Sequence, residues 1–139
     1  MIENKVEKKI MWGDLDPLGI VFYPRYYEWI DGCSHLFFER ISFDLIGLWK
    51  DRQIGFSLIE TFANYFSPGR YKQDIVILTR LGKLQRKAVT IHHNIMDKAS
   101  GKVMVRGYEK RVCMDARDPN NFKAMEIPDD VCSLFRQAM

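Results

Sequence analysis

Four long strand-like segments follow one another in the second half of the chain, and they limit the fold more than any other feature. Each is rich in Val, Ile, Thr, Tyr and Phe, the residue types that favour strands. A Ser-Pro-Gly loop and two short polar turns separate them, which is typical of hairpin connections. The predicted strands cover Phe56–Phe66, Asp74–Leu84, Lys87–Met96 and Lys102–Met114. The series predicts an antiparallel sheet.

One further strand and one helix are predicted before this sheet. Apolar and charged residues alternate over Lys5–Trp12, a period of two that indicates a strand. Apolar residues then recur every three to four positions over Pro24–Ile41, as in a helix with a buried face. Gly32 lies in the middle of this helix, where we expect another backbone to come close. The segment Asp44–Asp51 is interpreted as a connection between the helix and the first long strand.

The order of these elements predicts the fold class. A short C-terminal helix is expected after Ile127, because Pro128 and two acidic residues are suited to a first helical turn. A strand, one buried helix and four strands joined by hairpins describe an α+β fold, in which a curved antiparallel sheet wraps around a long central helix. We expect one such domain over residues 1–139. Free sheet edges favour pairing between copies, so we also expect a homo-oligomer.

Composition excludes several classes of function. The chain has 139 residues, of which 47% are hydrophobic and 28% charged, as in ordinary globular proteins. Its 21 basic and 18 acidic residues are interspersed, which is not typical of a nucleic-acid-binding surface. No apolar segment indicates a signal peptide or a membrane span, so we expect a cytoplasmic protein with no membrane partner. The three widely spaced cysteines fit reduced, buried thiols better than disulfides or a zinc site.

An acidic turn directly precedes the predicted central helix, in the sequence GDLDPLGIVFYP at residues 13–24. A helix N-terminus offers unpaired N–H groups and a partial positive charge, so it can polarise a carbonyl group. A carboxylate beside it can act on the carbonyl carbon. Asp14 and Asp16 are the candidates, although aspartates are also common in turns before helices. The pattern indicates an acyl-transfer site.

This turn and the residues RYYEWID after it closely resemble the signature of 4-hydroxybenzoyl-CoA thioesterases and related acyl-CoA thioesterases of the hotdog fold. A weaker similarity continues through residues 65–71, 86–87 and 124–128. The resemblance implies hydrolysis of an aromatic or short-chain acyl-CoA to the free acid and CoA. It implies no cofactor, because CoA is part of the substrate, and it implies a site between two subunits of a homodimer or homotetramer.

The resemblance also implies roles for individual residues. Asp16 matches the catalytic carboxylate of the family, which acts as nucleophile or as general base. The backbone N–H of Tyr23 matches the group that polarises the thioester carbonyl. Arg86 and Lys87 match residues near the CoA phosphates. Arg25 stands where many relatives carry Asn, and it adds positive charge near the site.

Several alternatives stay open on the sequence alone. The same fold could bind acyl-CoA or an acyl-carrier protein without catalysis, or it could hydrolyse a thioester of acyl-carrier protein. The aromatic residues Tyr23, Tyr26, Tyr27 and Trp29 either line an acyl pocket or fill the core. The adjacent pair His92-His93 does not predict a metal site, because neighbours in a strand point to opposite faces.

Overall fold

An antiparallel sheet with the strand order β1-β3-β4-β5-β2 forms the body of the molecule, and a short β6 pairs with β5. The computed structural model describes residues 1–139. The strands are β1 (Glu3–Lys9), β2 (Ile54–Tyr65), β3 (Asp74–Leu84), β4 (Ala88–Asp97), β5 (Val103–Asp115) and β6 (Lys123–Ala124). The four long strands and the N-terminal strand are therefore confirmed, with small shifts at their ends.

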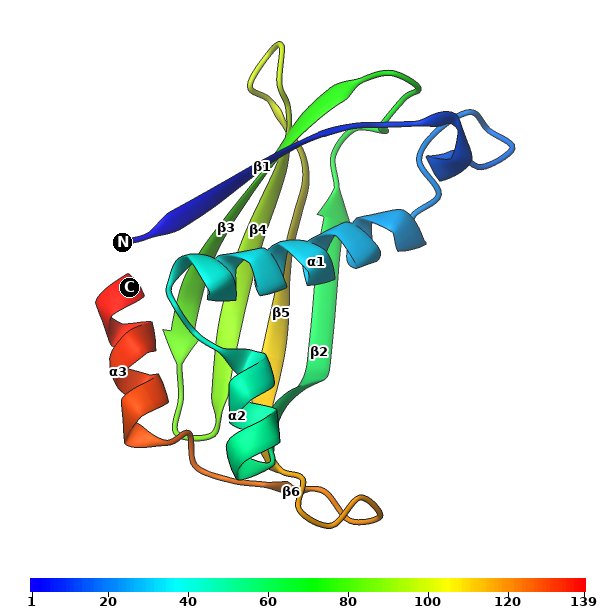
Figure 1. Cartoon of the computed structure of the whole chain (residues 1–139). Helices are drawn as coiled ribbons and strands as arrows, with labels where there is room; N and C mark the ends of the chain where they lie inside the picture. Colours follow the sequence, from blue (N-terminus) through cyan, green and yellow to red (C-terminus); the bar gives the residue numbers. More distant parts are fainter.

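One long helix and two shorter ones lie against this sheet. Helix α1 (Pro24–Arg40) crosses one face of the sheet, while α2 (Leu45–Arg52) and α3 (Asp129–Ala138) lie nearer the opposite end of the strands from the β1–α1 loop (Figure 1). The predicted central and C-terminal helices are confirmed. None of the helices combines the length and apolar character needed to cross a bilayer.

The interpretation of Asp44–Asp51 as a plain connection is wrong, because most of it forms α2. Asp44 is the N-cap, and its carboxylate accepts a hydrogen bond of 2.9 Å from the Gly47 N–H. Gln53 ends the helix in the left-handed conformation, with φ of 52°. Such a short helix carries too few residues for a clear apolar period.

The close backbone approach expected at Gly32 is not made within the chain. A Cβ atom at Gly32 would meet no atom within 4 Å. The close contact between α1 and the sheet occurs instead at Gly107 of β5, where a Cβ atom would lie 2.7 Å from the Phe62 carbonyl oxygen and 3.2 Å from Ile30 Cδ1. A glycine of the strand, and not of the helix, therefore lets α1 lie close to β5.

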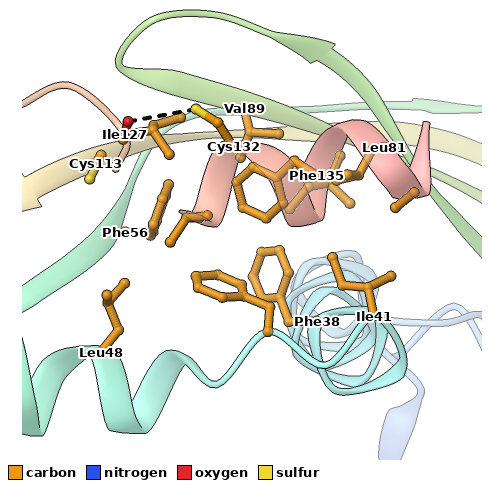
Figure 2. Close-up of a cluster of buried hydrophobic side chains, with 14 of the residues drawn as sticks. Phe38, Ile41, Leu48, Phe56, Leu81, Val89, Cys113, Ile127, Cys132 and Phe135 are labelled. Atoms are coloured by element: carbon orange, nitrogen blue, oxygen red, sulfur yellow. Dashed lines mark hydrogen bonds between the residues drawn. The ribbon is translucent and has the colours of Figure 1, made fainter. Parts of the chain in front are cut away.

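The larger of two hydrophobic clusters fills the space between the sheet, α3 and the C-terminal half of α1. Phe135 of α3 is fully buried in its centre, with ring centroids 5.3 Å from Phe43 and 6.0 Å from Phe56. Figure 2 shows Phe38, Phe56 and Phe135 of this cluster close together beneath α3. The Cys132 thiol donates to the Ile127 carbonyl oxygen at 3.6 Å. Cys33, Cys113 and Cys132 are all free and buried, as predicted.

The smaller cluster lies at the N-terminal end of α1 and includes Ile10, Val21, Tyr26 and Ile30. It joins the start of the helix to the end of β1 and to the turn that connects them. Large apolar side chains remain exposed around it: Met11, Trp12, Leu18, Phe22, Tyr23, Phe66 and Tyr71. This end of the molecule is therefore more open than the end covered by α3.

A buried polar network connects α1 to β3, β4 and β5 between the two clusters. His93 lies between Thr79 Oγ1 at 3.0 Å and Ser34 Oγ at 3.1 Å. The Ser34 hydroxyl donates to Glu109, whose carboxylate also pairs with Arg111 at 3.1 Å. Burial lowers the pKa of His93 to about 3, so its imidazole is neutral. His92, its neighbour in the strand, is only partly buried. No group of three or more His, Cys, Asp or Glu side chains is arranged to hold a metal ion.

Candidate active site

The acidic turn places the Asp16 carboxylate in a defined orientation. The Asp16 N–H donates to the Ile20 carbonyl at 2.8 Å, and the Gly19 N–H donates to the Asp16 carbonyl at 2.9 Å. Gly19 has φ of 76°, a conformation that glycine adopts without a steric penalty. Asp16 Oδ1 accepts a hydrogen bond of 2.8 Å from the Leu18 N–H. The second carboxylate oxygen has no hydrogen-bond partner in the chain, so one oxygen orients the group and the other is free.

The start of α1 presents an unused hydrogen-bond donor. Tyr23 is the N-cap of the helix, Pro24 follows it, and no side chain caps this end. The Tyr23 N–H donates to no acceptor in the chain. Tyr23 is 60% exposed, and its carbonyl accepts the Tyr26 N–H at 3.1 Å, so its backbone belongs to the first helical turn. An unpaired N–H at the positive end of a helix is suited to binding an oxygen that gains negative charge.

Asp16 and Tyr23 line one cavity of about 480 Å³. Its wall is mostly apolar and aromatic, and it combines the acidic turn, the first turn of α1 and the segment that follows β2. The other lining residues are Ile20, Val21, Tyr26, Tyr65, Phe66, Ser67 and Pro68. The two residues predicted for the reaction therefore meet at the same hollow of the surface.

The segment after β2 forms one wall of this cavity, and the sequence analysis did not identify its role. The Val21 N–H donates to the Gly69 carbonyl at 2.9 Å, and Ile20 pairs with Arg70 in an antiparallel bridge. The phenol oxygen of Tyr26 accepts a hydrogen bond of 3.1 Å from the Gly69 N–H. The available signal was the weaker similarity to the thioesterases over residues 65–71. It lies far from the acidic turn in the sequence, so the contact itself could not be predicted.

Of the four aromatic residues that were expected either to line an acyl pocket or to fill the core, Tyr26 does both. Its side chain is 3% exposed, and its ring packs 5.4 Å from Trp29 and 5.7 Å from Tyr65. Burial raises the pKa of its phenol. Tyr26 is thus part of the smaller cluster and of the cavity wall, whereas Trp29 packs behind it. Tyr23 lines the cavity but is largely exposed.

Asp14 and Arg25 stabilise the turn rather than face the cavity. Asp14 Oδ2 accepts a hydrogen bond of 2.9 Å from the Met11 N–H. Arg25 Nε lies 3.8 Å from Asp14 Oδ1, and Arg25 Nη1 lies 3.0 Å from Glu28 Oε2. The positive charge that Arg25 brings to the helix start is therefore balanced by two carboxylates.

Arg86 and Lys87 lie far from Asp16 within the chain. They connect β3 to β4, whereas the acidic turn lies beside the start of β3. The 11 residues of β3 separate these two ends by about 35 Å. Figure 1 shows the β3–β4 connection and the β1–α1 loop at opposite ends of the sheet. Arg86 Nε instead pairs with Glu126 Oε1 at 3.0 Å, and both side chains are exposed. One chain therefore does not bring these cations to its own cavity.

Two other hollows of the surface have a similar size, and one of them adjoins the cavity and is lined by charged residues. One of about 590 Å³ lies where α1 meets α2 and contains no residue of the acidic turn. Another, of about 490 Å³, adjoins the cavity by sharing Ser67 and Pro68, and Arg70 and Lys102 are among its lining residues. Neither cation forms an ion pair within 4.0 Å in the chain, and sequence analysis did not single them out. Asp97 lines the same hollow, so the rim beside the cavity carries two cations and one carboxylate.

A curved antiparallel sheet around one long helix is the architecture of the hotdog fold, the fold of thioesterase-like proteins. Residues 10–135 match the family model of the thioesterase-like superfamily, and the chain belongs to this family. The resemblance to the 4-hydroxybenzoyl-CoA thioesterases and the hotdog fold are both confirmed.

Individual relatives agree with this assignment. The chain is 25% identical over 137 residues to the 4-hydroxybenzoyl-CoA thioesterase of Pseudomonas sp. (strain CBS-3), covering 93% of this chain and 94% of the relative. A variant of 4-hydroxybenzoyl-CoA thioesterase, solved with 4-hydroxybenzoyl-CoA, has a TM-score of 0.87 at 25% identity, with 95% and 97% of the two chains covered. A gentisyl-coenzyme A thioesterase has a TM-score of 0.79 at 30% identity, with 96% and 99% covered.

Proposed function

We propose that this protein hydrolyses the thioester bond of an acyl-CoA, with an aromatic acyl group as the best fit. The observation that carries the proposal is that Asp16, which has a free carboxylate oxygen, and Tyr23, which has an unpaired N–H, line one cavity. A thioester needs an attacking oxygen and a donor where negative charge develops on its carbonyl oxygen. This cavity offers both groups.

The reaction can follow two routes through the same groups. In one, an Asp16 oxygen attacks the carbonyl carbon, the C–S bond breaks, and water then hydrolyses the acyl-aspartyl anhydride. In the other, Asp16 takes a proton from water while the water oxygen attacks the carbon, and the proton passes to the departing thiolate. Each route consumes one water and yields the acid and CoA. In both, the Tyr23 N–H and the positive helix end stabilise the oxyanion.

The lining of the cavity supports an aromatic acyl group. Tyr26, Tyr65 and Phe66 provide ring faces and edges, and Val21 and Ile20 provide aliphatic surface. Aromatic pairs with centroids about 4.5–7 Å apart are favourable beyond the area that they bury. Aromatic acyl groups are also named for the relatives, 4-hydroxybenzoyl in one and gentisyl in another.

The first experiment measures release of free CoA from a mixed panel of aromatic and aliphatic acyl-CoAs. We expect wild-type turnover to be fastest with a benzoyl-type substrate. Asp16→Asn should lower kcat by about a thousandfold or more, since the carboxylate supplies the reacting oxygen or base. Glu3→Gln, at an exposed position of β1 on the edge of the sheet opposite β2, is the matched control and should keep full activity.

The outcomes separate the remaining candidates. Near-normal turnover by Asp16→Asn would contradict the assignment of Asp16. Tight binding of acyl-CoA without any release of CoA would indicate a non-catalytic binding module. Hydrolysis of acyl thioesters of acyl-carrier protein, without hydrolysis of any acyl-CoA, would indicate that acyl-carrier protein carries the substrate.

The exposed edge of the sheet supports a dimer in which two chains share each site. Strand β2 has no neighbour on one side, and it exposes Leu58, Ile59, Phe62 and Tyr65 by 44–55%. An apolar edge strand of this length is a template for pairing with a second strand. Antiparallel pairing of two β2 strands about their midpoints would bury these side chains and continue the sheet across both chains.

Such pairing would bring the basic hairpin of one chain to the cavity of the other. The Tyr65 end of β2, beside the cavity, would lie opposite the Ile54 end of the partner strand. In each chain, Ser57 of β2 pairs with Val112 of β5, which pairs with Ala88 of β4. Lys87 and Arg86 of the partner subunit would thus lie two strands, or about 10 Å, from that edge. Within reach of the CoA phosphates, they would bind substrate in trans.

Mixing two variants tests this arrangement. We expect the double variant Arg86→Ala/Lys87→Ala to raise KM for acyl-CoA while retaining kcat. Coexpression of this variant with Asp16→Asn should restore active sites of low KM. Each mixed dimer then contains one site with an intact Asp16 from one chain and an intact Arg86 and Lys87 from the other. If the cations act on their own chain, no site of low KM can form in the mixture. Each variant expressed alone is the control.

A further inference from the structure

A single buried hydroxyl connects the helix start, the acidic turn and the cavity wall. Tyr26 lies in the first turn of α1, three residues after Tyr23, and its N–H donates to the Tyr23 carbonyl at 3.1 Å. Its phenol oxygen accepts the Gly69 N–H at 3.1 Å in a buried hydrogen bond. Tyr26 therefore holds the segment after β2 against the same helical turn that presents the Tyr23 N–H.

Gly69 extends this connection to the acidic turn. Its carbonyl accepts the Val21 N–H at 2.9 Å, and the adjacent Arg70 pairs with Ile20. The Ile20 carbonyl accepts the Asp16 N–H at 2.8 Å. A continuous set of hydrogen bonds thus runs from the Tyr26 phenol through Gly69 to the backbone of Asp16.

The packing around Gly69 leaves no space for a side chain at this position. A Cβ atom at residue 69 would lie 2.7 Å from Val21 Cγ2, 2.8 Å from Ile10 Cδ1 and 2.9 Å from the Tyr26 oxygen. All three distances are shorter than real Cβ contacts allow. The absence of a side chain at Gly69 lets the turn, the end of β1 and the phenol meet at one point.

We propose that Tyr26 is a positioning residue for the reaction, and that its hydroxyl fixes the Asp16 turn relative to the Tyr23 N–H. This inference rests on the proposed function. The reacting carboxylate belongs to a loop, and the oxyanion donor belongs to a helix. The Tyr26–Gly69 hydrogen bond is the side-chain link that holds the wall of the cavity to both. Tyr26 acts through Gly69 and the backbone, and not on the substrate itself.

Tyr26→Phe is the direct test, because it keeps the ring in the cluster and removes only the hydroxyl. We expect kcat for the best acyl-CoA to fall about tenfold or more, since small misplacements of reacting groups are costly. KM should stay within about twofold, because the cavity surface is unchanged. Hydrogen exchange at the Gly69 and Val21 amides should become faster in this variant than in the wild type.

Two further variants separate positioning from stability. Val131→Ala removes buried side-chain volume in α3, in the larger cluster, and should lower the melting temperature while keeping kcat. Gly69→Ala should lower kcat as Tyr26→Phe does, because its methyl group forces Val21 and Tyr26 away from the segment. Together these variants distinguish a local displacement of the turn from general loosening of the fold.

The results that overturn the inference are distinct from those that overturn the proposed function. Wild-type kcat in Tyr26→Phe, in a protein whose Asp16→Asn variant is inactive, would refute the positioning role alone. An equal loss of kcat in Val131→Ala would refute it as well, since stability would then explain the effect. Absence of CoA release by the wild-type protein from every thioester would overturn both.

Discussion

The two ends of α1 pack against the rest of the chain in different ways. At its C-terminal end, α3, α2 and the sheet enclose a cluster of 16 buried residues centred on Phe135. At its N-terminal end, the buried cluster has 10 residues, and several large aromatic side chains around it remain exposed. The closed end derives its stability from burial of apolar surface. The open end holds the cavity lined by Asp16 and Tyr23 and keeps a polar N–H and a carboxylate oxygen unpaired, whereas the hollow between α1 and α2 contains no residue of the acidic turn.

This difference explains why the reacting groups lie where they do. Unpaired polar groups are costly when buried in a packed core, so they persist only where a ligand or solvent reaches them. Asp16 and the Tyr23 N–H occupy such a place, at the edge of the smaller cluster. The backbone of the turn is nevertheless fixed by hydrogen bonds to Ile20 and Gly69. The open end is therefore ordered without being densely packed.

The largest expected difference between the ends concerns stability. Phe135→Ala should lower the free energy of unfolding by about 3–5 kcal/mol, because it leaves a cavity in the closed cluster. The kcat of the molecules that remain folded should be unchanged. Urea denaturation and CoA release measured on the same sample test both statements. Phe122→Ala, at a position that is 50% exposed, is the control and should change stability by less than about 0.5 kcal/mol.

A fall in kcat in Phe135→Ala, with the fraction folded taken into account, would contradict the independence of the two ends. It would mean that packing beneath α3 controls the position of the helix start some distance away.

The next effect concerns the polar network between the two clusters. The pKa of His93 is about 3 in the folded protein, against about 6.5 for an unperturbed histidine. The unfolded chain therefore binds a proton more readily. The stability gained from neutral His93 is complete above pH 6.5 and is lost as the pH falls towards 3. We expect the free energy of unfolding to decrease by up to about 1.4 kcal/mol per pH unit in this range.

The comparison of wild type with His93→Gln isolates this contribution. Glu109 and Arg111 face the imidazole from β5, and both stay in the variant. Denaturation between about pH 5 and 6.5 avoids most of the titration of carboxylates. The variant should have a shallower slope than the wild type in this window, and part of the slope remains because burial also lowers the pKa of His92. His92→Gln is the matched control and should keep the part of the slope that is due to His93. Equal slopes in the wild type and in His93→Gln would show that His93 is not the group that titrates.

The smallest expected effect lies at the open end. Leu18 is 78% exposed in the acidic turn, and Leu18→Ser keeps the backbone N–H that bonds to Asp16. We expect the free energy of unfolding to change by less than about 0.5 kcal/mol. Urea denaturation provides the measurement. A loss above 1 kcal/mol would show that this side chain packs on protein and would sharpen the case for a partner subunit at this end.

The sequence predicted the elements with strong local patterns and missed those without them. The long strands are rich in Val, Ile, Thr, Tyr and Phe and are separated by turn residues, and α1 has an apolar stripe, so both could be predicted. Helix α2 depends on the Asp44 cap and on packing of one buried residue, Leu48, so its sequence shows no clear period. Gly32 was misinterpreted because a glycine alone does not reveal which backbone approaches it; the close contact lies at Gly107.

The candidate site divides in the same way. Asp16 and Tyr23 lie seven residues apart at a turn and a helix start, so their meeting follows from local geometry. The cavity wall from Tyr65 to Pro68 comes from a distant segment, and Arg86 and Lys87 reach a site only if a second chain provides it. Proximity along the chain explains the first pair, and the bridge between Ile20 and Arg70 brings the wall to the turn. The two cations lie outside the cavity of their own chain.

By itself, the sequence determined the antiparallel strands, the central helix and the carboxylate at its start, because each depends on residues within one turn or one strand. The tertiary structure decided which separate segments meet. It joined Tyr26 to Gly69 across 43 positions and Ser34 to His93 across 59. Such contacts form when burial of apolar surface draws helix and sheet together, and the directions of hydrogen bonds then select one arrangement.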